Sequence, residues 1–147
     1  MNHPVSEFVA SLVGIETILS GKVIRRNSGT VLVSVSGQEI EAAGNSNPGD
    51  AVALCIRAEN VLLSNIASGN QRNDINTFPG TVERIMAAGL YRKVQLNCGF
   101  PLVAYVTNSS FSDLSLKEGA EVLASFKIKA VHVIRSATGS VLTGSKS

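Results

Sequence analysis

The 147-residue sequence contains no tryptophan and few aromatic or charged residues, and these shortages disfavour one class of protein. Aromatic residues make up 5% of the chain, charged residues make up 16%, and the formal net charge is only +2. Proteins that bind nucleic acid use clustered positive charge, and single-strand binders also use aromatic stacking surfaces. We therefore expect no nucleic-acid partner, and an OB-type nucleic-acid binder is the least favoured of the alternatives.

Cysteines and long apolar runs are also scarce. Cys55 and Cys98 form no CxxC pair and have no histidine at metal-ligand spacing, so we expect two buried thiols in a reducing compartment. The longest apolar stretches, such as 52–56, are far shorter than the roughly 20 residues that span a bilayer. Residues 1–10 lack the features of a signal peptide. These absences predict a cytoplasmic protein.

Groups that could perform catalysis are equally few. His3 lies near the terminus and His132 lies in a segment rich in β-branched residues. Spacing alone leaves a Ser-His-Asp arrangement open, but no nucleophile elbow or metal motif supports one. We expect no enzymatic activity and no cofactor, and we interpret His132 as a packed or surface residue of a strand.

The chain contains an internal repeat. The matching segments are 48–63 with 118–133, 21–23 with 80–82, and 39–42 with 101–104. The offset grows along the chain, so the second copy carries an insertion at 107–116. Within it, the segment from Ser110 to Asp113 resembles a capping box that opens a short helical turn.

Each copy has the pattern of about five short strands. Val31, Val33 and Val35 alternate with other residues, and turn signals rich in glycine, asparagine and serine divide each copy. Closure is the simplest way to protect the edges of so many short strands. The sequence therefore predicts an all-β fold of two tandem OB-like five-stranded barrels with a short N-terminal helix. The expected boundaries are a helical segment at 1–19, a first barrel at 20–65, a linker at 66–76, a second barrel at 77–136 and a flexible tail at 137–147.

The second copy offers the groups that a tetrahedral oxyanion requires, which are hydrogen-bond donors and one or two cations. The candidate donors at the helical turn, where free N–H groups favour an anion, are Thr107, Asn108, Ser109 and Ser110. Lys127 and Lys129 alternate along an expected strand, which would put both ammonium groups on one face. The alternative interpretation is that both lysines are solvated and that Ser110 only caps a helix.

Two longer segments, 104–119 and 122–135, resemble the TOBE/Mop molybdate-binding family. The resemblance rests on a thr-x-x-ser then leu-x-leu-x-x-gly spacing, on a lysine in the fifth strand, and on the opening Asn76-x-Phe-x-Gly80-x-Val82. The segment 56–63 is similar to the isoleucine-arginine-proline-glutamate segment in C-terminal extensions of importer ATPases, with alanine in place of proline. The segment 7–14 resembles the stretch that follows the nucleotide-binding domain of those subunits.

The resemblance implies a regulatory domain of an ABC importer's ATP-binding subunit. Such domains sense intracellular molybdate or tungstate and modulate transport. The implied partners are the importer's ATPase and membrane subunits and a second copy in a homodimer, at the inner face of the cell membrane. No Walker loop precedes the first barrel in the sequence, so the implied role here is not catalytic.

Binding sites of the family often combine residues from two subunits. Carried over by position, they correspond to Asn73, Ile75, Thr107 and Lys127, and the neighbouring Asn76 belongs to the same motif. Ile75 stands where the family has an arginine and provides no charge-assisted donor. Two hypotheses follow: a site rebuilt with Arg72 or Lys129, or a structural dimerisation module whose anion site has decayed.

Overall fold

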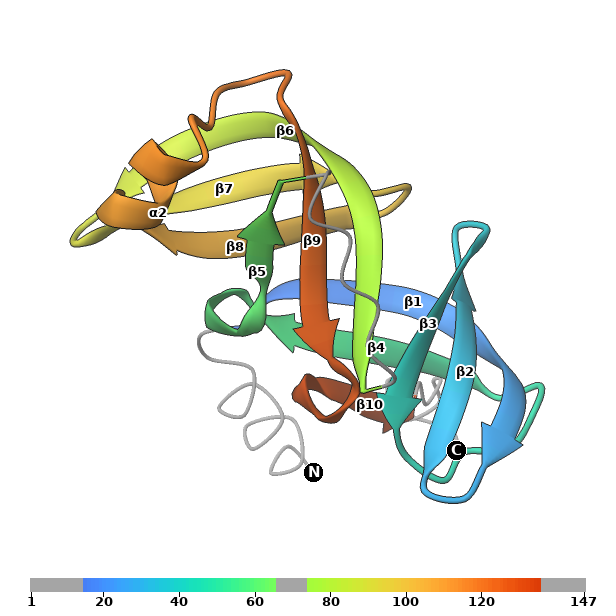
Figure 1. Cartoon of the computed structure of the whole chain (residues 1–147). Coiled ribbons are helices and arrows are strands. Elements are labelled where there is room, and N and C mark those ends of the chain that lie inside the picture. Colours follow the sequence, from blue (N-terminus) through green and yellow to red (C-terminus); the bar gives the residue numbers. More distant parts are fainter. Residues whose placement is uncertain (1–14, 66–73, 136–147) are drawn as a thin grey trace, which may run out of the picture.

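The computed structural model describes residues 15–65 and 74–135, and almost all of its regular elements are strands (Figure 1). The strands are β1 (Ile15–Asn27), β2 (Thr30–Val35), β3 (Gln38–Ala43), β4 (Ala51–Arg57), β5 (Leu62–Ser64), β6 (Ile75–Ala88), β7 (Tyr91–Asn97), β8 (Pro101–Thr107), β9 (Glu121–Lys127) and β10 (Val131–Arg135). The helices of the described residues are α2 (Asn108–Asp113) and the short 3-10 helices η1 (Ala58–Asn60) and η3 (Ile128–Ala130). The predicted all-β class is confirmed.

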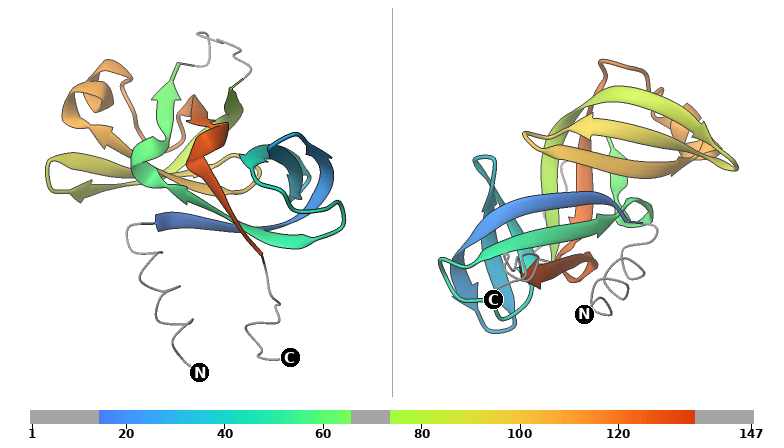
Figure 2. Two further views of the ribbon diagram at one scale, coloured as in Figure 1. Left: turned by 90° about the horizontal axis from the view of Figure 1, so that it is seen from below. Right: turned by 180° about the vertical axis from the view of Figure 1, so that it is seen from behind.

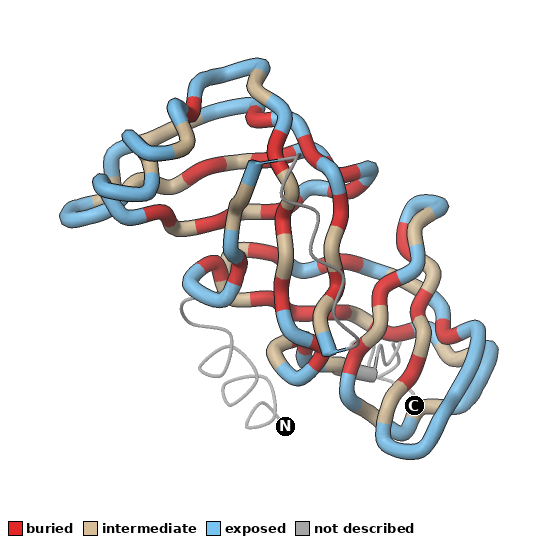
Figure 3. Tube along the Cα trace, in the orientation of Figure 1, coloured by how far each residue is buried: buried red, intermediate tan, exposed pale blue. Residues whose placement is uncertain are grey.

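Alternating burial explains why these segments are strands. In β2, Val31, Val33 and Val35 are buried, whereas the residues between them are half-buried (Figure 3). The same period of two runs through β8 and β9. Because successive side chains of a strand point to opposite faces, each sheet gains one apolar face that packs inward. In the second sheet, the Phe78 ring contacts those of Phe100 and Phe126, with centroids 5.2 and 6.0 Å apart.

The strands form two curled five-stranded sheets, which confirms the predicted two-barrel architecture. The first closes as a barrel in the order β1-β2-β3-β10-β4, and the second has the order β5-β9-β6-β7-β8 (Figures 1 and 2). The long strands β1 and β6 each carry an irregularity in their pairing, between Val23 and Arg25 in one and between Val82 and Arg84 in the other. Such irregularities increase local twist, which helps each sheet to curl.

The two copies of the repeat exchange strands. β5 belongs to the first copy but pairs with β9 of the second sheet, where Leu62 lies opposite Ser125. β10 belongs to the second copy but enters the first barrel between β3 and β4, where Val133 lies opposite Leu54. Each sheet is therefore built from both copies, and neither copy forms its sheet alone.

The predicted boundaries differ from the observed strands. Residues 15–19, placed in the helical segment, are already part of β1, and the rest of that segment and the tail 137–147 lie outside the described residues. Residues 75 and 76, placed in the linker, begin β6. The division into barrels at 20–65 and 77–136 is corrected by the strand exchange. Sequence patterns identify strands but do not show which sheet a strand joins.

Equivalent hydrogen bonds join the two halves on both sides of their junction. The Asn76 side chain of β6 accepts from the backbone N–H of Glu41 and donates to its carbonyl oxygen, both at 2.9 Å. At the equivalent place on β1, Thr17 Oγ1 accepts from the backbone N–H of Val103 at 3.1 Å. Thr17 and Asn76 are the two buried polar residues of the described part of the chain. The first strand of each half is therefore bonded to the third strand of the other.

Candidate functional site

The predicted oxyanion-binding residues separate into two groups in the structure. Thr107 lines a cavity of about 400 Å³ together with Glu59, Tyr91 and Tyr105. Lys127 lines another cavity, of about 290 Å³, which also includes Glu59. The two cavities therefore share Glu59 as a lining residue, and one chain does not place Thr107 and Lys127 in the same cavity.

The cavity at Lys127 lies where β6, β9, β5 and the two 3-10 helices come together. Ile75 is the register partner of Lys127 in the β6–β9 pair, and Leu62 and Phe126 add further apolar lining. Lys127 and Glu59 are the charged residues of this lining, and their formal charges cancel. Ile75 thus lies opposite Lys127, but it contributes a hydrocarbon surface and no hydrogen-bond donor.

The predicted strand with two lysines on one face is wrong. β9 ends at Lys127, and Lys129 lies in η3. A 3-10 helix has about three residues per turn, so positions 127 and 129 point in different directions. Both side chains are exposed. The alternation of Lys127 and Lys129 suggested one continuous strand, but β9 ends at the first of these two residues.

The donors of the first group lie at the start of α2. Thr107 is the N-cap, and its Oγ1 accepts from the backbone N–H of Ser110 at 3.1 Å. The predicted helical turn is therefore confirmed, but the capping residue is Thr107 and not Ser110. Thr107, Asn108, Ser109 and Ser110 are all exposed.

Arg92 of β7 is the cation that the structure places beside these donors. Its Nε donates to Asn108 Oδ1 at 3.4 Å, and its guanidinium carbon lies 4.6 Å from the centroid of the Phe111 ring. Arg92 pairs with Val106, the residue before Thr107, in the β7–β8 register. Sequence reasoning missed Arg92 because its proximity to α2 follows from this register and from no motif.

Of the two predicted asparagines, Asn76 lies among the described residues and Asn73 does not. Asn76 uses both its oxygen and its nitrogen to bond the Glu41 backbone, and it is 8% exposed. Its prediction as an anion ligand is corrected, because the side chain ties the two halves together. Asn73 and Arg72 lie outside the described residues.

A second group that the sequence did not reveal joins β1 to β7 and β8. Glu16 accepts a hydrogen bond from the Tyr105 hydroxyl at 2.8 Å and forms an ion pair with Lys93 Nζ at 2.9 Å. The Tyr105 ring also stacks on Tyr91, with centroids 4.6 Å apart. The hydrogen bond from Lys93, with a smaller contribution from Tyr105, lowers the pKa of the Glu16 carboxyl. The hydrogen bond that the Tyr105 hydroxyl donates to Glu16 is the main cause that raises the pKa of Tyr105 to about 12.

These shifts predict an acid-sensitive contribution to stability. The pKa of Glu16 is lower in the folded chain than in the unfolded chain. Its contribution to stability is therefore complete at pH values above the ordinary pKa of a carboxyl group, and it is lost as the pH falls through the pKa of the folded chain. We expect the wild-type chain to lose more stability than Glu16→Gln between about pH 6 and pH 3. Urea unfolding at several pH values measures the difference. Parallel curves for the two chains would contradict the prediction.

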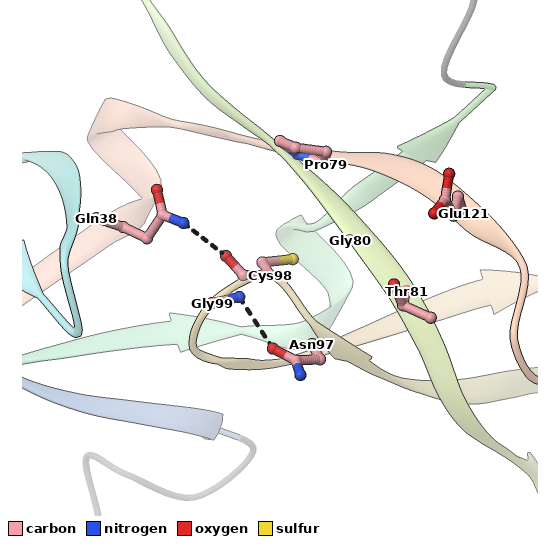
Figure 4. Close-up of a pocket in the computed structure, with 8 residues that line it drawn as sticks. All are labelled: Gln38, Pro79, Gly80, Thr81, Asn97, Cys98, Gly99 and Glu121. Atoms are coloured by element: carbon pink, nitrogen blue, oxygen red, sulfur yellow. Dashed lines mark hydrogen bonds between the residues drawn. The ribbon is translucent and has the colours of Figure 1, made fainter.

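A further cavity, of about 260 Å³, lies where the start of β3 in the first barrel meets β6, β9 and the β7–β8 turn (Figure 4). Gln38 Nε2 donates to the Cys98 carbonyl oxygen at 3.3 Å across this junction. Glu121 is the charged residue of its lining, so the cavity offers no cation to an oxyanion. Cys98 and Cys55 are buried free thiols, as predicted, and burial raises the pKa of the Cys98 thiol to about 11.

The described residues contain no group of three or more histidine, cysteine, aspartate or glutamate side chains that could hold a metal ion. No helix among those residues has the length and apolar character needed to cross a membrane. His132 is an exposed residue of β10, which agrees with its interpretation as a strand residue.

Comparison with known proteins shows what this chain is similar to. Two import proteins named molybdate/tungstate import ATP-binding protein WtpC are similar over 90% of this chain: that of Pyrococcus horikoshii with 34% identity and that of Pyrococcus abyssi with 30%. The chain covers 36% of the length of each of these relatives. A crystal structure of the cytoplasmic molybdate-binding protein ModG, with molybdate bound, has the same fold, with a TM-score of 0.70 and 23% identity. It aligns over 82% of this chain and 96% of ModG. Residues 73–133 match the model of the TOBE domain family, in agreement with the motifs of this segment.

Proposed function

We propose that this chain binds molybdate or tungstate as a non-catalytic regulatory domain of an importer's ATP-binding subunit. The observation that carries the proposal is the similarity of 90% of the chain to the molybdate/tungstate import proteins, together with the position of Lys127 opposite Ile75 at the start of β6. The fold shared with a molybdate-binding protein supports the same ligand class. As part of such a subunit, the chain would act in the cytoplasm at the membrane's inner face.

The regulatory part of the proposal follows from linkage. A ligand shifts a conformational equilibrium by the difference between its affinities for the two states, and such couplings typically amount to about 1 to 3 kcal/mol. Bound oxyanion would in this way report the internal concentration of the transported substrate to the ATPase and membrane subunits.

A second copy of the chain completes the proposed site. Within one chain, Lys127 faces Ile75 and Glu59, whereas the hydroxyl and amide donors stand at α2 beside Arg92. A homodimer would bring the α2 donors of one chain to Lys127 of the other. Such an arrangement gives a dianion both a cation and several donors, which its desolvation requires.

The test is thermal unfolding of the full chain with increasing molybdate, tungstate and sulfate at constant ionic strength. A ligand that binds the folded state raises stability with the logarithm of its concentration. We expect a saturable rise with molybdate or tungstate, a loss of that rise in Lys127→Ala, and roughly threefold tighter binding in Glu59→Gln, which removes the nearby negative charge. Lys117→Ala is the matched control, because Lys117 is an exposed lysine outside both cavities.

The competing proposal is a structural dimerisation module. Ile75 favours it, because the cavity at Lys127 lacks a second cation and contains a carboxylate. A chain that sediments as a dimer but shows no oxyanion-specific stabilisation at millimolar concentration would establish this alternative.

A further inference from the structure

Lys93 and Tyr105 are the kinds of residues that form an anion-binding site, and the Glu16 carboxylate occupies the place of the anion. Lys93 provides an ammonium group at 2.9 Å and Tyr105 a phenolic donor at 2.8 Å, and both reach the same carboxylate from neighbouring strands of one sheet. Glu16 comes from β1 of the other sheet. The donors and the anion are thus supplied by different halves of the molecule.

The backbones of the two donor residues and the ring of Tyr105 are held in place independently of the anion. Lys93 and Tyr105 are register partners in the β7–β8 pair, which fixes the distance between their backbones. The Tyr105 ring is also stacked on Tyr91. Lys93 and Glu16 are each about one quarter exposed, at 27%, so solvent reaches the group. Removal of the carboxylate would leave two oriented donors that a dissolved anion can reach.

The other junction lacks this arrangement. Ile75 precedes Asn76 as Glu16 precedes Thr17, and Asn76 and Thr17 make the equivalent bonds between the halves. The β2–β3 pair that corresponds to Lys93 and Tyr105 is Thr30 with Ala43. None of these three counterparts carries a charge. The carboxylate and its donors are therefore a specific feature of one junction and no general consequence of the repeat.

We propose that Lys93 and Tyr105 form a binding site for a carboxylate or a small oxyanion, and that the Glu16 side chain is its resident ligand. Glu16 holds the two halves together and closes this junction to dissolved anions. On the other side, Lys127 forms no ion pair within residues 15–65 and 74–135, although Glu59 lines the same cavity, so that cavity stays open to a dissolved oxyanion. That last consequence rests on the proposed function, whereas the site itself does not.

Chemical rescue tests the proposal. Glu16→Ala removes the atoms of one acetate ion, so sodium acetate is the probe and sodium chloride at equal ionic strength is its control. We expect the full-length variant to melt about 3 °C below the wild type in chloride and to recover most of this loss, saturably, in acetate. The wild type and Glu118→Ala, which removes an exposed carboxylate outside this group, should show no acetate-specific shift. Adding Lys93→Met to Glu16→Ala should abolish the recovery.

Each result decides the question. An acetate response of Glu16→Ala no larger than that of the wild type overturns the proposal, and so does a response that persists without Lys93. If Glu16→Ala does not fold in chloride, acetate should restore its circular dichroism spectrum, and failure to do so also overturns the proposal. Molybdate titration by calorimetry should rise from one site per chain in the wild type to two in Glu16→Ala. A wild type that binds no molybdate would refute the proposed function and leave the acetate result intact.

Discussion

Truncation of the chain after Ala130 is expected to unfold the first barrel, although the deleted strand β10 belongs to the second copy of the repeat. β10 lies between β3 and β4, and five of its residues pair with β4. Without it, the first sheet opens at two edges and exposes buried residues such as Leu54 and Ile56, which β10 faces in the register. Loss of a whole strand exceeds the effect of any single substitution, because native domains are stable by only about 5 to 15 kcal/mol.

Urea unfolding followed by circular dichroism measures this effect. The control is truncation after Arg135, which removes only residues that follow β10 and should leave the unfolding midpoint within error of the full chain. A chain that ends at Ala130 and still unfolds with the midpoint of the full chain would contradict the strand exchange.

Asn76→Ala is expected to lower the free energy of unfolding by about 2 to 4 kcal/mol, the second largest effect. The substitution removes two hydrogen bonds of 2.9 Å and leaves the backbone N–H and carbonyl of Glu41 without their side-chain partner. Buried backbone groups that lose their partners retain the full cost of desolvation. The effect should appear in stability and should leave the Lys127-dependent anion response in place.

The internal repeat supplies the matched control for Asn76. Thr17→Val removes one hydrogen bond of 3.1 Å at the equivalent place, with little change in volume, and should cost about half as much. Chemical denaturation of both variants gives the comparison. Equal losses, or an Asn76 variant as stable as the wild type, would show that the amide is not the main bond across its junction.

Local patterns were sufficient to predict the strands and the helical turn. The alternation at Val31, Val33 and Val35 and the motif around Thr107 are properties of adjacent residues, and both appear in the structure as expected. The exchange of β5 and β10 could not be predicted, because a short apolar strand pairs equally well with either sheet as far as its own residues indicate.

The candidate site was predictable only in part, for a related reason. The pairing of Lys127 with Ile75 follows from motif positions on two strands of one copy. Arg92 beside Asn108, and Glu16 beside Lys93, depend on register and on the approach of the two halves. Asn76 was misassigned because a polar residue in a binding motif and a polar residue that bonds a distant backbone look the same in sequence.

The order in which a ribosome produces the chain gives the strand exchange a further meaning. The barrel that begins at Ile15 receives its closing strand from residues 131–135, so it stays open until those residues have been made. Pairings between segments this far apart carry a high loop-closure cost and form slowly. During that interval, the edges of β3 and β4 are free to pair with another chain, which is a known route to exchanged dimers. The newly made chain thus depends on β10 to prevent pairing with neighbouring chains.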